Sequence, residues 1–290
     1  MMYPEVRAAV AADDSPDLSV PGFDVAAHRE KVRRFNLRQP REDVASVEDV
    51  DADGVPCRLY TPADARPGLV VHAHGGGFVL NDVDVHDGIC RRMANRGRRA
   101  VLSVDYRRPP EARFPAAPDD LDTVVRWLRR EGPPGPYAAH GDSAGANLAL
   151  VVALRNPGFF TVLALIYPFL DPRCAFPSWD EARDTGFDPA EAQWYWEQYG
   201  GPPDDPDLAP LRSRRRRFSR ILEPVLVIAA EHDPLLEENH RLVQRLRSVG
   251  VDVQVTTYPG MVHGFWRNPA LFDAAEESLA EIADFLRRAV

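Results

Sequence analysis

The sequence has 290 residues, a hydrophobic fraction of 44% and a formal net charge of -9. A chain of this length can bury one large core, and its acidic balance argues against a nucleic-acid or anionic-membrane partner. No apolar run approaches the roughly 18 residues of a membrane span, and the N-terminus lacks the apolar core of a signal peptide, so we expect a cytoplasmic protein. Cys57, Cys90 and Cys174 form no C-x-x-C pair, which predicts neither a disulfide framework nor a zinc knuckle.

The first 45 residues are polar and interrupted by prolines, and they predict two short helices, near residues 3–12 and 24–37. From about residue 46, short apolar segments alternate with helical patterns. The predicted strands cover residues 54–62, 68–74, 100–106, 136–140, 161–168, 224–233 and 251–260. The predicted helices cover residues 85–97, 117–131, a segment that begins at Ser143, 236–248 and 269–289. In the last helix one face is apolar and carries Leu271, Ala275, Leu279, Ile282 and Leu286.

Alternating buried strands and helices predict an α/β fold, in which a mostly parallel central sheet is covered by helices on both faces. Residues 175–220 interrupt this alternation, because they hold tryptophans, prolines and an arginine cluster but no strand pattern. We expect this segment to be a helical insertion that packs over the sheet together with residues 1–45, as a cap. The core then comprises residues 46–174 and 221–290. The run at 212–220 could bind nucleic acid, but on an acidic chain a solvated face of the cap is the better interpretation.

Polar residues follow four of the predicted strands where each strand ends. Gly75, Gly76 and Gly77 follow the first of them, and Ser143, Asp233 and His263 follow three later ones. Ligands of an open α/β sheet bind at the carboxyl ends of its strands, so we expect these residues to meet there.

These residue types fit acyl transfer. A serine hydroxyl needs an adjacent base, a histidine can accept and return its proton, and an aspartate can orient the imidazole. The glycines of G-x-S-x-G around Ser143 permit a sharp strand-to-helix turn, and a glycine loop lets a substrate approach backbone N–H donors. The chain order Ser, Asp, His is that of the α/β-hydrolases.

Five ordered segments resemble motifs of the hormone-sensitive-lipase-like (bacterial family IV) esterases. They are "HAHGGGFVL" (72–80), "DYRRPPEARFPAAPDD" (105–120), "GDSAG" (141–145), "EHDPLLEE" (231–238) and "MVHGF" (261–265). The resemblance implies an α/β-hydrolase fold with a helical cap and a Ser143–Asp233–His263 triad. It further implies that Gly76, Gly77 and Ala144 donate to the oxyanion, and that His74, Gly75 and Asp142 support them. Arg107 and Glu111 match structural positions, whereas Arg108-Pro109 departs from the usual Leu-Ala.

Alternative interpretations exist for several of these residues. Asp233 could be only the N-cap of the following helix, and Glu231 is a weaker candidate for the acid. His72 and His74 could form a metal pair, but without a nearby third ligand packing is the expected role, so no metal site is predicted. The remaining histidines are expected at the surface or in packing: His28, His86, His140, His232 and His240. The glycine run lacks the order and the Lys-Ser/Thr ending of a phosphate loop.

The sequence therefore predicts a serine carboxylic-ester hydrolase that acts on short- to medium-chain acyl esters. Its partner is a small-molecule ester, no cofactor is required, and a homodimer is possible. An amidase or deacetylase of a specialised metabolite, or a non-catalytic small-molecule receptor on the same fold, are the alternatives. Aromatic residues of the insertion either attach the cap to the core or close the acyl channel at modest depth: Trp179, Phe187, Trp194, Tyr195, Trp196 and Tyr199. If they close the channel, replacement of Trp194 or Trp196 with alanine should favour longer acyl chains.

Overall fold

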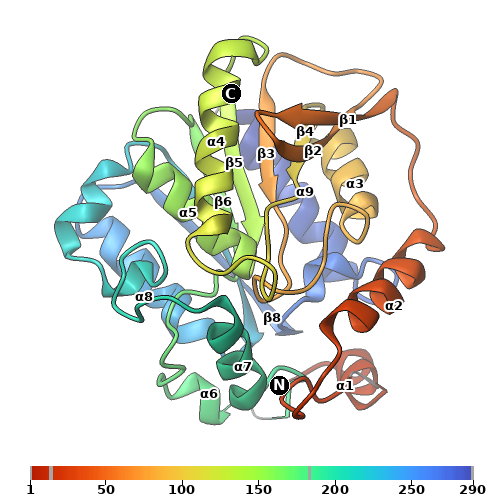
Figure 1. Cartoon of the computed structure of the whole chain (residues 1–290), viewed down its shortest axis with the longest axis vertical. Coiled ribbons are helices and arrows are strands. Elements are labelled where there is room, and N and C mark those ends of the chain that lie inside the picture. The colour runs from red at the N-terminus through yellow and green to blue at the C-terminus, as the bar shows by residue number, and fades with distance from the viewer. Residues whose placement is uncertain (1, 13–15, 182–183, 289–290) are drawn as a thin grey trace.

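A computed structural model of the chain describes residues 2–12, 16–181 and 184–288. Its centre is one sheet of eight strands in the described residues, in the order β1-β2-β4-β3-β5-β6-β7-β8 (Figure 1). The strands are β1 (Ser46–Ala52), β2 (Val55–Thr61), β3 (Leu69–Ala73), β4 (Ala100–Val104), β5 (Tyr137–Asp142), β6 (Val162–Ile166), β7 (Val225–His232) and β8 (Val253–Val262). The pairs from β4 to β8 are parallel, and β1 and β2 join antiparallel at one edge. The predicted mostly parallel sheet is confirmed.

The central strands form where the sequence has short apolar runs. Every residue of β3 and β6 is buried, as expected for strands covered on both faces. By contrast, β1 was not predicted as a strand, because Glu48, Asp49 and Asp51 leave it with no apolar run. Its exposed acidic side chains suit an edge position, where charge opposes pairing with another chain.

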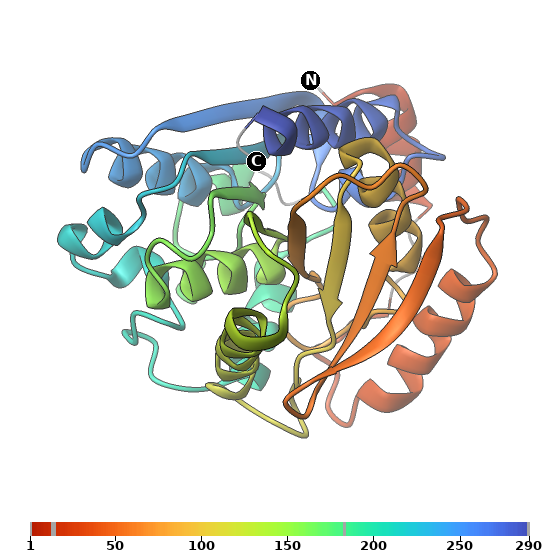
Figure 2. The same ribbon diagram turned by 90° about the horizontal axis from the view of Figure 1, so that it is seen from above.

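Helices cover both faces of the sheet (Figure 2). Two of them pack against each other and fill one apolar cluster: α3 (Asp87–Gly97) and α9 (Asp273–Arg288). Three lie on the opposite face over a second cluster: α4 (Ala116–Glu131), α5 (Ala144–Arg155) and α8 (Leu236–Arg247). None of the helices in the described ranges combines the length and apolar character that crossing a bilayer requires.

The last helix differs in one respect from its prediction. It begins at Asp273, so Leu271 precedes it and is 59% exposed, whereas Ala275, Leu279 and Ile282 are buried as expected. Residue 289, the predicted end of this helix, lies outside the described residues.

The two segments expected to form a cap contribute short helices. The N-terminal segment holds α1 (Pro4–Ala11) and α2 (Val25–Leu37). The insertion holds α6 (Ser178–Glu181), α7 (Pro189–Tyr199) and the 3-10 turns η1 (Pro210–Arg212) and η2 (Arg215–Arg220); a further 3-10 turn, η3 (Phe265–Arg267), follows β8. In Figure 1 the helices α1, α6 and α7 gather at the lower end of the molecule. In the arginine run, Arg214, Arg216 and Arg220 are exposed.

Candidate active site

Ser143 occupies a strained turn between β5 and α5. Its backbone has φ 54° and ψ -119°, a left-handed region that costs free energy for a residue with a Cβ. Its N–H donates to the Ile166 carbonyl at 2.8 Å, which fixes the turn against the neighbouring strand β6. The turn therefore presents the Ser143 side chain at the carboxyl edge of the sheet.

Glycines flank Ser143 because the turn leaves no space for larger residues. A Cβ on Gly141 would overlap the Gly145 backbone, and a Cβ on Gly145 would overlap the carbonyl of Ala73 on β3. The small residues of the sequence motif thus permit close contact between α5 and the sheet, as expected.

The imidazole of His263 links two groups that are distant in sequence. Its Nε2 lies 3.0 Å from Ser143 Oγ, and its Nδ1 lies 2.8 Å from Asp233 Oδ2. His263 directly follows β8 and Asp233 directly follows β7, so adjacent parallel strands deliver both. The Asp233 side chain is 1% exposed, while His263 remains partly accessible.

The geometry also distinguishes between Asp233 and Glu231, the two candidates for the acid that contacts His263. The other oxygen of Asp233 accepts from the Leu235 N–H at 2.8 Å, so the carboxylate stabilises the turn before α8 as well as contacting His263. Glu231 is exposed and accepts instead from the Gly260 N–H at 2.7 Å, a contact that lowers its pKa.

The glycine loop after β3 is held by Asp142. The Gly75 N–H donates to Asp142 Oδ1 at 2.9 Å. Gly76 and Gly77 then adopt φ values of 115° and 59°, which favour glycine, and a Cβ on Gly77 would overlap the Tyr195 ring. In the described residues we find no acceptor for the backbone N–H groups of Gly76, Gly77 or Ala144. The loop and the start of α5 therefore offer backbone donors close to Ser143.

His74, Arg107 and Glu111 of the sequence motifs have structural contacts. The His74 ring stacks on Tyr106 at 4.2 Å, and the Tyr106 hydroxyl donates to the His74 carbonyl at 2.7 Å. Arg107 forms a two-pronged ion pair with Asp120 on α4. Glu111 pairs with Arg29 of α2, whose Nε donates to the Val79 carbonyl at 2.8 Å. Arg29 thus connects the N-terminal segment to the glycine loop.

A cavity of about 430 Å³ opens between the N-terminal segment and α7. Phe187 and Tyr195 line it, and the same two rings contact His263 and Gly77 respectively. Its lining residues come from the N-terminal segment, from the insertion and, with Leu80, from the loop after β3. They are Val10, Pro16, Asp17, Leu18, His28, Leu80, Gly186, Phe187, Asp188, Glu191 and Tyr195.

Trp194 and Trp196 do not line this cavity. Trp194 packs edge-on against Phe23, while Trp196 contacts Phe78 and Phe169 in the core cluster. This differs from the expectation for these two tryptophans: of the aromatic candidates in the insertion, Phe187 and Tyr195 line the cavity.

The expectation for His86 and His140 is also refined. Both are fully buried in packing, but they form a cluster with His72 and His74 directly behind the glycine loop. Burial lowers the pKa of all four imidazoles, to about 3 for His72. No sequence spacing relates His72 to residues 14 and 68 positions further on, so only the fold reveals the cluster.

Comparisons with known proteins show the family and the fold of the chain. A family model described as alpha/beta hydrolase fold matches residues 70–267. An ethyl acetate hydrolase from Pseudomonas putida is 31% identical over 82% of this chain and 80% of its own length. The structure of a hyperthermophilic esterase from Pyrobaculum calidifontis superposes with a TM-score of 0.88, at 30% identity over 99% of this chain and 98% of that one. An esterase structure from the bacterial hormone-sensitive lipase family has the same fold, with a TM-score of 0.88 at 24% identity over 100% of this chain and 99% of that one.

Proposed function

Because this chain belongs to the alpha/beta hydrolase fold family, as a carboxylesterase of the hormone-sensitive-lipase-like kind, we propose that Ser143, His263 and Asp233 are its catalytic triad. One observation carries this proposal: a continuous path of two contacts, 3.0 Å and 2.8 Å long, joins the hydroxyl to the buried carboxylate through one imidazole. A serine nucleophile needs an adjacent base, and in this arrangement the imidazole is that base and the carboxylate orients it.

In the first half of the reaction, Ser143 Oγ attacks the ester carbonyl carbon while His263 Nε2 accepts the hydroxyl proton. The carbonyl oxygen gains negative charge and receives hydrogen bonds from the N–H groups of Gly76, Gly77 and Ala144. Asp233 accepts from His263 Nδ1 and stabilises the imidazolium that forms. When the tetrahedral intermediate collapses, the bond to the alcohol oxygen breaks and His263 returns the proton to that oxygen.

The second half repeats these steps with water. A water molecule attacks the acyl-enzyme carbonyl, His263 accepts its proton, and the second tetrahedral intermediate forms in the same N–H cradle. Its collapse releases the carboxylic acid and restores the Ser143 hydroxyl. Every proton moves through His263, so the chemistry needs no cofactor.

We propose that the substrates are esters of short and medium acyl chains, bound in the cavity beside α7. Phe187 and Tyr195 support this proposal, because both line the cavity and contact the triad histidine or the glycine loop. Residues 1–45 and 175–220 then act together as the cap over a core of residues 46–174 and 221–290. The name of the ethyl acetate hydrolase, a relative that cleaves a short ester, supports the same substrate class.

Replacement of Ser143 with alanine tests the nucleophile. We expect Ser143→Ala to reduce kcat for p-nitrophenyl butyrate by a factor on the order of 10⁶. The three triad residues act as one unit, so loss of the nucleophile costs about as much as loss of the whole triad. A fluorophosphonate probe should add one covalent label to the wild type and none to the variant, measured by mass spectrometry. Labelling of the variant at another serine would assign the nucleophile elsewhere. Turnover of p-nitroanilides as fast as matched esters would favour the amidase alternative.

A further inference from the structure

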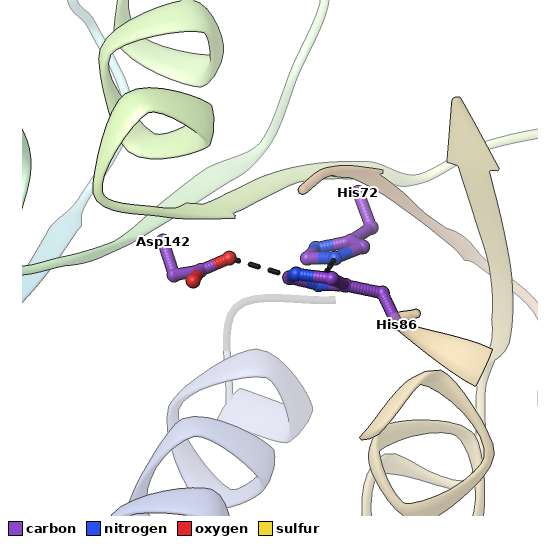
Figure 3. Close-up of side chains that lie close together, drawn as sticks. All are labelled: His72, His86 and Asp142. Atoms are coloured by element: carbon purple, nitrogen blue, oxygen red, sulfur yellow. Dashed lines mark hydrogen bonds and ion pairs between the residues drawn. The ribbon is translucent and has the colours of Figure 1, made fainter. Parts of the chain in front are cut away.

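Three side chains from separate elements meet behind the glycine loop. His72 lies on β3, His86 precedes α3, and Asp142 ends β5. All three are at most 2% exposed. In Figure 3 the Asp142 carboxylate points toward the His86 ring, and the His72 ring lies against the His86 ring, above it in this view. These residues take no part in the proposed ester chemistry, although Asp142 also holds Gly75.

The spacing of their ligand atoms suits a small divalent ion. His72 Nε2 lies 3.1 Å from His86 Nδ1, and His86 Nδ1 lies 3.8 Å from Asp142 Oδ1. One ligand atom from each of the three residues lies within 4.8 Å of the others. Zinc–ligand bonds of about 2.0–2.2 Å separate the ligand atoms of a tetrahedral site by about 3.3 Å, so small side-chain shifts suffice.

The surroundings of His72 match those of a metal-bound imidazole. Its Nδ1 lies 2.9 Å from Nδ1 of His140, so His72 can donate this proton and keep the lone pair at Nε2, where an ion would replace the hydrogen bond with His86 Nδ1. Metal-binding histidines usually donate their second nitrogen's proton in this way, which fixes the tautomer. His140 thus contacts the proposed ligand His72 and is not itself a ligand.

The cluster also contains polar groups with few partners. His74 can donate from Nδ1 to the Gly75 carbonyl at 2.9 Å, and its Nε2 then keeps a bare lone pair with no partner among the described residues. The His74 and His86 rings lie 5.5 Å apart. Near the buried Asp142 carboxylate, the Arg267 guanidinium is no closer than 3.7 Å. A divalent ion at this position would add positive charge beside a buried carboxylate whose contacts include the Gly75 N–H and this long ion pair.

We propose that His72, His86 and Asp142 bind one divalent transition-metal ion of the zinc class. Two imidazoles and one carboxylate favour such an ion over magnesium or calcium, which prefer oxygen ligands. The ion would connect β3, α3 and β5 next to Ser143, and so stabilise the folded state without entering the ester chemistry. The sequence analysis expected no metal at His72 and His74 for want of a nearby third ligand, whereas the proposed site combines His72 with His86 and Asp142, which the fold brings close.

Metal content of the protein, produced with Zn²⁺ and without a histidine tag, tests the proposal. We expect one zinc per chain after gel filtration, and a melting temperature about 5 °C above the zinc-free protein at a free Zn²⁺ concentration 100-fold above Kd. Refolding with Co²⁺ should give visible ligand-field absorption, which reports the coordination geometry. Refolding gives the ion access to a site that is fully enclosed in the folded state.

Variants assign the ion to this cluster. His86→Gln should lose the zinc, and His140→Gln should weaken its affinity by 10- to 100-fold, as expected of an outer-shell partner. His240→Asn, at an exposed position on α8, is the matched control and should retain one zinc. Ser143→Ala should also retain it, which separates this proposal from that of the triad.

Two results would overturn the site. Wild-type protein with well under one zinc per chain and no cobalt absorption would exclude it, whether or not any variant folds. Equal zinc content in the wild type and in folded His86→Gln would place the ion elsewhere.

Discussion

The ring of Phe187 stacks on the imidazole of His263, with centroids 4.8 Å apart and an interplanar angle of 26°. Tyr167 covers the same imidazole at 4.6 Å. Phe187 belongs to the insertion and Tyr167 to the loop after β6, so the imidazole is enclosed by residues from both the insertion and the core. The insertion therefore influences the position of the proposed base.

Phe187→Ala should move the acyl-chain optimum. For the wild type we expect kcat/KM to rise from acetyl to butyryl or hexanoyl p-nitrophenyl esters and to fall by dodecanoyl, since each accommodated CH₂ contributes about 0.8 kcal/mol. Removal of the ring should lengthen the best chain, because it lowers the wall of the cavity. Trp194→Ala, whose side chain packs on Phe23, is the control and should leave the optimum in place. A wild type that prefers palmitoyl to butyryl esters contradicts the enclosed cavity.

Asp233→Asn should reduce kcat by about 10⁴, because an amide favours the wrong tautomer of His263. Glu231→Gln is the matched control, since Glu231 contacts Gly260 and not His263. Steady-state rates with p-nitrophenyl butyrate measure both. If Glu231→Gln shows the larger loss, the acid of the triad has been assigned to the wrong residue.

Gly145→Ala should strongly destabilise the protein, because the added methyl group would overlap the Ala73 backbone, which cannot move aside like a flexible side chain. Overpacking in a close-packed core costs about 1–3 kcal/mol, and often more where backbone must shift. Gly88→Ala in α3 is the control: a Cβ there meets no atom within 4 Å, and the change should be neutral or stabilising. Urea unfolding of both variants compares the free energies. Equal free energies of unfolding for Gly145→Ala and Gly88→Ala would mean that α5 can shift away from β3 without cost.

Acid should destabilise the zinc-free protein from pH 7 downward. Burial holds the pKa values of His72, His74, His86 and His140 below the ordinary 6.5, so the unfolded chain binds protons that the folded chain does not. Their contribution is intact above pH 6.5 and falls as pH decreases, by up to about 5 kcal/mol between pH 7 and 5.5 for four such groups. The raised pKa of Asp142 opposes this loss at lower pH, because the folded form takes up that proton first.

Urea unfolding at several pH values in chelating buffer measures this slope. His140→Asn should reduce the loss of stability between pH 7 and 5.5 by about a quarter, or about 1.2 kcal/mol, whereas the exposed His240→Asn should not change it. A free energy of unfolding that is flat between pH 7 and 5.5 would show that the cluster is protonated or hydrated in the folded protein.

The sequence predicted the elements that depend on local patterns. Apolar runs such as "LVVHA" identified β3, and the ordered motifs placed Ser143, Asp233 and His263 at three strand ends. β1 was missed because its pairing with β2, and not its own composition, makes it a strand. On α7, the large side chain of Trp194 made it a candidate for the channel wall. The buried face of this helix is instead marked by helical spacing, at Ala192, Tyr195, Trp196 and Tyr199. Relations such as that of His72 to His86 depend on how the elements pack, which no local pattern contains.

Among the described residues, the walls of the cavity come from Val10, from residues 16–28 and 186–195 and from Leu80, and none of these lies on a strand. The triad and the N–H donors, by contrast, sit at strand ends and on the turns that follow them. Recombination between relatives could therefore exchange these two short segments and alter the range of esters accepted while the reaction chemistry is inherited intact. In an evolving lineage, substitutions in the first thirty residues would therefore change the range of accepted esters before they changed the catalytic mechanism.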